Sequence, residues 1–207
     1  MADESTSQLR LFISLPVPEA VRVALQQAQQ ELREGLPPRA RNAVRWTNPD
    51  QLHLTLRFLG EVDEPRVPSL LNALQSACQP FPRLQLRAER VGFFPERRLP
   101  RVVWIGVQDR GGTLARLQQA VETAVHRFSA SPATEEFKGH LTIGRIRSLR
   151  PADADALRGF AQKMSARVFG EWIADSVHLM QSELLAQGAR HTSIGTAPLS
   201  APAPAAE

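Results

Sequence analysis

Two histidine–threonine pairs, one in each half of the chain, are the residues best suited to chemistry. His53 and Thr55 stand two positions apart in an apolar segment, and His140 and Thr142 repeat this spacing in a second one. Successive side chains of a β-strand point to opposite faces, so each pair places an imidazole and a hydroxyl on one face while the aliphatic neighbours face a core. If two such strands lie together, their polar faces would form a symmetric cleft, and this is what the pattern predicts.

Two imidazoles on opposite sides of a phosphorus atom could open a cyclic phosphodiester. With the ordinary histidine pKa of about 6.5, one ring can be neutral and accept a proton from water while the other is charged and protonates the leaving oxygen. Thr55 and Thr142 would donate hydrogen bonds to the nonbridging phosphate oxygens. The histidines have no Asp, Glu or Cys at ligand spacing, so we predict no metal and no cofactor. The sequence alone does not fix which histidine is the acid.

The apolar periodicity and the Gly and Pro residues predict an alternating series of strands and helices around these motifs. We expect strands at 10–15, 43–46, 51–59, 84–91, 102–107, 140–146, 175–185 and 191–199, the last two forming a hairpin that turns at 187–188, and helices at 19–34, 65–77, 113–128 and 151–165.

Strand, helix and motif strand recur in the same coarse order in both halves of the chain. We therefore predict an α+β fold of two pseudo-symmetric lobes, each a mainly antiparallel sheet with outer helices, which flank a central cleft. Residues 9–199 would form this single bilobal domain, with repeated halves at about 9–80 and 81–199. We expect disordered tails at 1–8 and 200–207.

Composition is that of an ordinary globular protein, with 43% hydrophobic and 22% charged residues among 207. No apolar run approaches the roughly 18 residues of a membrane span, and the first residues lack the pattern of a secretory signal. Cys78 is the single cysteine. We expect a cytoplasmic monomer without membrane contacts. The formal net charge of +4 comes largely from clustered arginines, which suit either a polyanion such as RNA or a solvated basic surface.

The segments beginning at His53 and His140 resemble the paired His-x-Thr-x motifs of the 2H phosphoesterase superfamily. Within it, the early Phe-Ile-Ser-Leu-Pro strand, Trp46 and Arg145 resemble RNA 2′,3′-cyclic phosphodiesterases, also called 2′-5′ RNA ligases. The resemblance spans about 9–199. It implies hydrolysis of a terminal 2′,3′-cyclic phosphate to a 2′-phosphate, with His53 as proton donor and His140 as acceptor. The implied partners are RNA ends, such as tRNA fragments, or nucleotides.

Two arginines are candidates for binding the substrate. Arg145 closes the second motif, and the resemblance implies that it binds phosphate. Its parity is opposite to that of His140, so the strand must end or bulge near Gly144 if Arg145 is to face the cleft. Arg57 has the same parity as His53, so a regular strand would aim it into the cleft too.

Several alternatives stay open at this point. The chain could be a related phosphodiesterase that acts on small cyclic nucleotides or 2′-5′ oligonucleotides, an enzyme that also runs in reverse as a 2′-5′ RNA ligase, or a non-catalytic binder of RNA or nucleotides. His178 and His191 are weaker candidates for contact with substrate. Members of the family often have an aromatic residue, commonly Tyr, at the position of His191. Phe12 could stack a base, although a core position fits it better.

Overall fold

One antiparallel sheet forms the frame of the protein. The computed structural model describes residues 7–129, 131–132, 136–185 and 188–200. Within these ranges nine strands pair in the order β7-β4-β5-β6-β3-β1-β8-β9, with β2 added beside β6. The strands are β1 (Gln8–Pro16), β2 (Val44–Trp46), β3 (His53–Asp63), β4 (Leu84–Phe94), β5 (Val102–Asp109), β6 (His140–Ile146), β7 (Val168–Ala174), β8 (Ser176–Leu185) and β9 (Gly188–Pro198).

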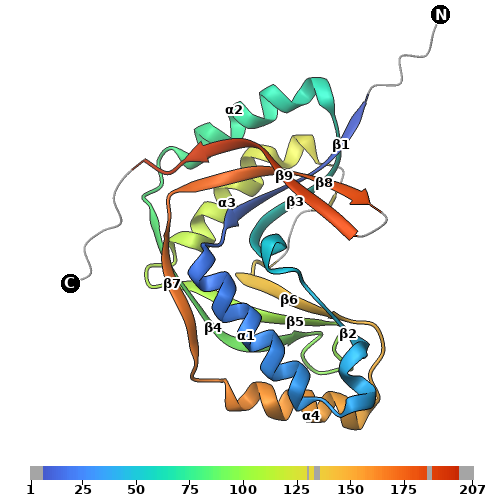
Figure 1. The fold of residues 1–207 in the computed structure, drawn as a ribbon. Helices are drawn as coiled ribbons and strands as arrows, with labels where there is room; N and C mark the ends of the chain where they lie inside the picture. Colours follow the sequence, from blue (N-terminus) through green and yellow to red (C-terminus); the bar gives the residue numbers. More distant parts are fainter. Residues whose placement is uncertain (1–6, 130, 133–135, 186–187, 201–207) are drawn as a thin grey trace, which may run out of the picture.

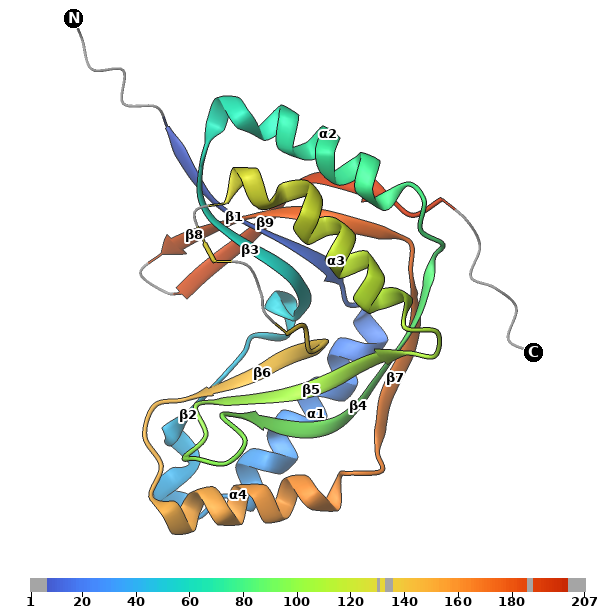
Figure 2. The ribbon, with the colours of Figure 1, turned by 180° about the vertical axis from the view of Figure 1, so that it is seen from behind.

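The sheet divides into two lobes where β3 meets β6. These two strands share a single paired position, Leu54 opposite Leu141, whereas β3 and β1 pair along most of their length. One lobe holds β3, β1, β8 and β9, and the other holds β6, β5, β4, β7 and β2. Figures 1 and 2 show the two groups of strands diverging from this junction. The predicted α+β fold with two largely antiparallel lobes is confirmed.

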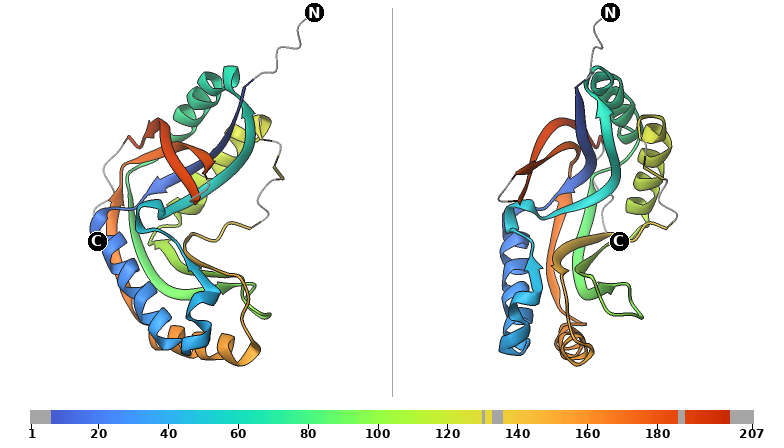
Figure 3. Two further views of the ribbon diagram at one scale, coloured as in Figure 1. Left: turned by 45° about the vertical axis from the view of Figure 1, so that its right-hand side comes forward. Right: turned by 90° about the vertical axis from the view of Figure 1, so that its right-hand side faces the viewer.

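Each lobe contains strands from both halves of the chain. β1 pairs with β3 on one side and with β8, from the second half, on the other. In the second lobe, β2 from the first half pairs with β6 from the second half. The first helix, α1 (Glu19–Gly35), packs against β7 and α4 (Pro151–Lys163). The chain therefore crosses between the lobes more than once, as the sequence of colours in Figure 3 makes visible.

Helices cover the outer face of each lobe. α2 (Val67–Cys78) and α3 (Thr113–Val125) pack together over β9 and β3, while α4 covers β4. The buried stripe of α1, with Val21, Leu25, Ala28 and Leu32, has the spacing expected of an amphipathic helix. Short 3-10 helices lie at η1 (Pro38–Ala43), η2 (Pro49–Gln51), η3 (Glu64–Arg66) and η4 (His126–Phe128). In the described part of the chain, no helix combines the length and apolar character that crossing a membrane would require.

Some boundaries differ from those predicted. β7 was not predicted, because Gly170, with φ of 154°, interrupts the alternation, so that the buried Phe169 and Trp172 stand three positions apart. β3 continues beyond Gly60 to Asp63, since pairing with β1 extends to Gln8. Gln8 thus belongs to a strand and not to the tail. The predicted tails at 1–6 and 201–207 lie outside the described residues, and so does position 187 of the predicted hairpin turn, while position 188 begins β9.

Candidate active site

A β-bulge follows the His-x-Thr pair in each motif strand. In β3, Thr55 pairs with Ser14 and Arg57 pairs with Ile13, so Leu56 is the extra residue opposite β1. In β6, Thr142 pairs with Trp104 and Gly144 with Val103, so Ile143 is extra opposite β5. A bulge of this kind reverses the alternation of side chains beyond it.

The bulge in β6 brings Arg145 to the same face as His140 and Thr142. Gly144 turns inward, where a Cβ atom would meet Val44 Cγ1 at 2.9 Å, and Arg145 is exposed. The expected bulge near Gly144 is therefore present. Arg145 also lies near enough to both motif histidines for its positive charge to lower the pKa of each.

The bulge in β3 has the opposite effect on Arg57. This side chain is only 4% exposed, and its Nε lies 3.2 Å from Glu122 Oε2 of α3. Its Nη2 donates to the Ser131 carbonyl at 2.8 Å, and its Nη1 donates to the Pro132 carbonyl at 2.5 Å. The prediction that Arg57 points into the cleft is wrong, because strand parity was extended across a bulge.

The junction of the lobes brings the two motifs together. Leu54 and Leu141 are paired and buried, and they face away from the histidines. Because the strands are antiparallel, His53 lies toward Thr142, and Thr55 lies toward His140. The four predicted side chains therefore share one side of the junction, in an arrangement with approximate two-fold symmetry.

Both imidazoles are oriented by the same main-chain contact. Nδ1 of His53 lies 2.7 Å from the Gln51 carbonyl oxygen, and Nδ1 of His140 lies 2.7 Å from the Lys138 carbonyl oxygen. A carbonyl can only accept, so Nδ1 carries the proton and donates it in each case. Each ring thus keeps Nε2 available, as an acceptor when neutral and as a donor when charged.

The surroundings of both rings favour the neutral form. Burial lowers the pKa of His53 to about 4, although the bond to Gln51 opposes the shift, and the charges of His191, Arg145 and His140 add to it. Burial also lowers the pKa of His140, with contributions from Arg145 and Lys138. An anionic phosphate between the rings would counter these effects by stabilising the charged imidazolium.

Aromatic rings flank each histidine. Phe12 of β1 lies 4.7 Å from the His53 ring centroid, and His191 of β9 lies 5.4 Å from it. In the second lobe, Phe94 lies 5.1 Å and Trp104 6.3 Å from His140. The sequence analysis did not single out Phe94 or Trp104, since their proximity to His140 arises from the pairing of β4, β5 and β6.

His178 lies two strands away from Thr55. It pairs with Ser14 of β1, which in turn pairs with Thr55, and its Nε2 lies 3.2 Å from the Ser176 hydroxyl. Burial lowers its pKa and that of His191. Of these two histidines, His191 is the one whose ring lies beside a motif histidine, His53.

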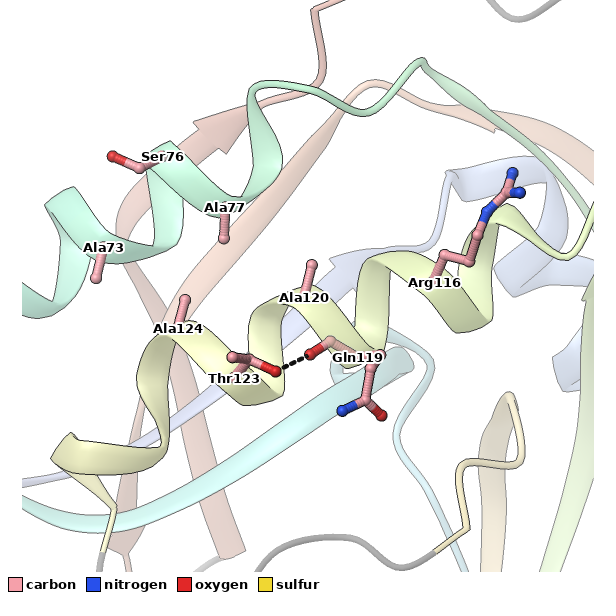
Figure 4. A pocket seen from close by; sticks show the side chains of 8 residues that line it. All are labelled: Ala73, Ser76, Ala77, Arg116, Gln119, Ala120, Thr123 and Ala124. Atoms are coloured by element: carbon pink, nitrogen blue, oxygen red, sulfur yellow. Dashed lines mark hydrogen bonds between the residues drawn. The ribbon is translucent and has the colours of Figure 1, made fainter.

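A separate hollow lies between α2 and α3. Its volume is about 730 Å³, and Figure 4 shows small side chains such as Ala73, Ala77 and Ala120 around it. These helices cover the outer face of the lobe, so this hollow is separate from the histidines. Among the described residues, no three His, Cys, Asp or Glu side chains are grouped closely enough to hold a metal ion. Metal independence stays a prediction.

An antiparallel sheet divided into two lobes brings together two strands with a His-x-Thr pair, and a bulge follows each pair. This is the framework of a two-histidine phosphoesterase. The chain belongs to the LigT like phosphoesterase family, whose pattern matches residues 15–104 and 105–191. A relative from Archaeoglobus fulgidus, an RNA 2′,3′-cyclic phosphodiesterase, is 35% identical over 87% of this chain and 94% of its own.

Solved structures agree on the fold. The crystal structure of a protein of Thermus thermophilus, TT0787, matches with a TM-score of 0.74 and 27% identity, over 93% of this chain and 99% of that one. The crystal structure of E. coli LigT complexed with 3′-AMP matches with a TM-score of 0.72, also over 93% and 99%. At 21% identity, this second likeness concerns the fold alone.

Proposed function

We propose that the protein is an RNA 2′,3′-cyclic phosphodiesterase that hydrolyses a terminal 2′,3′-cyclic phosphate to a 2′-phosphate. The name of the Archaeoglobus relative supports this activity. The observation that carries the proposal is the matched pair of histidines, each with Nδ1 bound to a main-chain carbonyl at 2.7 Å. Two rings fixed in the same tautomer suit an in-line displacement at phosphorus, which needs one proton acceptor and one donor.

The roles of the site residues follow from this reaction. His140 takes a proton from water, whose oxygen forms a new bond to phosphorus, while the bond from phosphorus to O3′ breaks and His53 protonates O3′. The assignment of His140 as proton acceptor and His53 as proton donor rests on the family resemblance. Thr55 and Thr142 would donate to the nonbridging oxygens, and Arg145 would balance the charge that develops on them. The proposed mechanism uses no metal and no cofactor.

Other activities of the same site are the principal alternatives. Reversal of the reaction would join RNA ends by a 2′-5′ link. A site that takes small cyclic nucleotides or 2′-5′ oligonucleotides would use the same histidines. We further propose that the partners are RNA ends or nucleotides with a cyclic phosphate. As expected from the sequence, we also propose that the protein is a monomer located in the cytoplasm.

The test is hydrolysis of a short RNA that ends in a 2′,3′-cyclic phosphate, with EDTA present. The proposal predicts turnover and a 2′-phosphate product. His53→Ala and His140→Ala should each abolish turnover without unfolding the protein. His126→Ala is the matched control, since His126 is exposed on η4 and its Nδ1 lies 2.8 Å from the Thr123 carbonyl oxygen.

Each of the other possible results of this experiment supports one alternative or refutes one part of the proposal. Equal or better turnover of adenosine 2′,3′-cyclic phosphate would favour a small-nucleotide enzyme, and binding of RNA without turnover would favour a non-catalytic binder. Near-normal rates in either motif-histidine variant would refute the two-histidine mechanism. Loss of turnover in EDTA that added metal restores would refute metal independence.

A further inference from the structure

Two buried glutamines lie behind the motif strands. In the described part of the chain, Gln29 of α1 and Gln118 of α3 are the only glutamines that are buried, with 5% and 4% exposure. Gln29 Nε2 donates to the Ile143 carbonyl of β6 at 2.8 Å, and Gln118 Nε2 donates to the Leu56 carbonyl of β3 at 3.4 Å. Both acceptors are the bulge residues of their strands. A bulge disrupts the strand pairing locally, so contacts from outside the sheet can determine its geometry.

Gln29 makes the shorter of these contacts, and its amide joins two strands. Its Nε2 also donates to the Thr47 carbonyl at 2.8 Å, and the Thr47 main-chain N–H donates to the Ile143 carbonyl at 3.0 Å. Both hydrogens of the amide are therefore used. These contacts lie just beyond the last pair of β2 with β6, which is Trp46 opposite Gly144. The bulge of β6 is thus held from α1.

Packing of the helix does not by itself require an amide at position 29. The other buried residues of α1 are apolar, and a buried amide is unfavourable unless its hydrogen bonds are satisfied. What Gln29 adds is a fixed location for the Ile143 carbonyl. The bulge at Ile143 decides on which face Arg145 lies, two residues further on. A change in the bulge would therefore displace the guanidinium group relative to the two motif side chains of β6.

We propose that Gln29 is a positioning residue for Arg145, because it holds the bulge of β6 so that the guanidinium group faces the reacting phosphate. This inference rests on the proposed function. Gln29 is buried and acts through the main chain, without contact with the substrate. A group that stabilises charge in the transition state must be placed closely, since a displacement of about 1 Å can cost about 100-fold in rate. Gln29 therefore affects kcat more than KM.

The test is a double-mutant cycle on the hydrolysis of a short RNA that ends in a 2′,3′-cyclic phosphate. Gln29→Met removes both donors and keeps an unbranched side chain of similar length. It should lower kcat about 10- to 100-fold in the wild type and have little further effect in Arg145→Ala, which lacks the group that Gln29 positions. Gln27→Met changes an exposed residue of the same helix and should leave the rates unchanged. If circular dichroism shows that Gln29→Met does not fold, Gln29→Asn, whose amide has a shorter reach, takes its place.

The outcomes separate this inference from the proposed function. An equal loss of kcat in both backgrounds, or no loss in either, would overturn the positioning role, because a general loosening of the fold acts whether or not Arg145 is present. If the wild type does not hydrolyse the RNA, the proposed activity fails, and NMR titration of His140 in the free protein decides the role of Gln29. Arg145 lowers the pKa of His140, so a displaced guanidinium group in Gln29→Met should raise that pKa. An unchanged pKa of His140 would overturn the inference.

Discussion

At the scale of single residues, the environment of the histidines decides how they can act. Both rings are held by Nδ1, so neither can rotate to exchange its two nitrogens without losing a main-chain hydrogen bond. Burial and neighbouring positive charges lower both pKa values, that of His53 to about 4. Near pH 7 the free protein therefore has two neutral rings, and the acid must acquire its proton when an anionic substrate binds.

This leads to a prediction about the pH dependence of the reaction. Because the acid is protonated only at low pH in the free protein, kcat/KM should already decline as the pH rises through neutrality. The bound phosphate raises the pKa of the acid, so the alkaline limb of kcat should lie at a higher pH than that of kcat/KM. Rates measured between pH 5 and 9 test this, and coincident limbs would contradict it.

Arg145 provides a second prediction at this scale. It is exposed, so Arg145→Ala should change the free energy of unfolding by less than about 0.5 kcal/mol. Loss of a positive charge near the reacting phosphate should lower kcat/KM about 100- to 1000-fold. Arg145→Lys should restore part of the activity. A fully active Arg145→Ala protein would remove Arg145 from the site, and Arg147→Ala, two residues beyond, is the matched control.

At the scale of elements, the two bulges determine which side chains share the face of the motif histidines. Arg57 and Arg145 lie on similar motif strands, yet Arg145 is exposed on that face while Arg57 is buried. Arg57 instead connects β3 with α3 through Glu122, and with the segment at Ser131 and Pro132 that precedes β6. A buried charge needs such partners, since its removal from water is costly. Arg57 is therefore part of the support of the motif strand.

Arg57→Ala should consequently destabilise the protein by about 3 to 5 kcal/mol, because Glu122 would stay buried without its partner. The double variant Arg57→Leu with Glu122→Leu should recover much of this loss, since it removes both charges together. Unfolding in urea, followed by circular dichroism, measures both effects. If Arg57→Ala is as stable as the wild type but has a higher KM, Arg57 has a substrate role after all.

At the scale of the whole molecule, the two lobes belong to one sheet, and the chain passes between them more than once. Neither half of the chain contains all the partners of its own strands, since β1 of the first half pairs with β8 and β6 of the second half pairs with β2. The side chains of His53, His140, His178 and His191 lie in this shared structure, and burial lowers the pKa of each. Folding and proton binding should therefore be linked across both lobes.

We predict that the protein unfolds in one cooperative transition and that its free energy of unfolding decreases in acid. Below pH 6.5 the unfolded chain protonates these histidines while the folded protein resists, so stability is complete above about pH 6.5 and declines as the pH falls. The decline continues to about pH 4 for His53, which alone accounts for up to about 3 kcal/mol. Thermal unfolding at pH 7 and pH 5 measures this effect. His53→Gln should reduce the acid sensitivity, and His126→Gln should not.

Two separate transitions would contradict this picture and would indicate that the lobes fold independently. A fragment of residues 1–80 provides a further check, because β1 would lack β8 and α1 would lack β7. We expect this fragment to be unfolded by circular dichroism.

The sequence by itself determined the strand character of both motifs, their paired histidines and threonines, and the α+β class. These depend on local properties, namely alternation with a period of two and helical spacing of apolar residues. The family resemblance added Arg145. The sequence could not reveal that Arg57 is buried, since the bulge at Leu56 is defined only by pairing with β1. The interleaving of the lobes was likewise decided by tertiary structure, because strand pairing joins residues that are distant in the chain, and local periodicity carries no information about such partners.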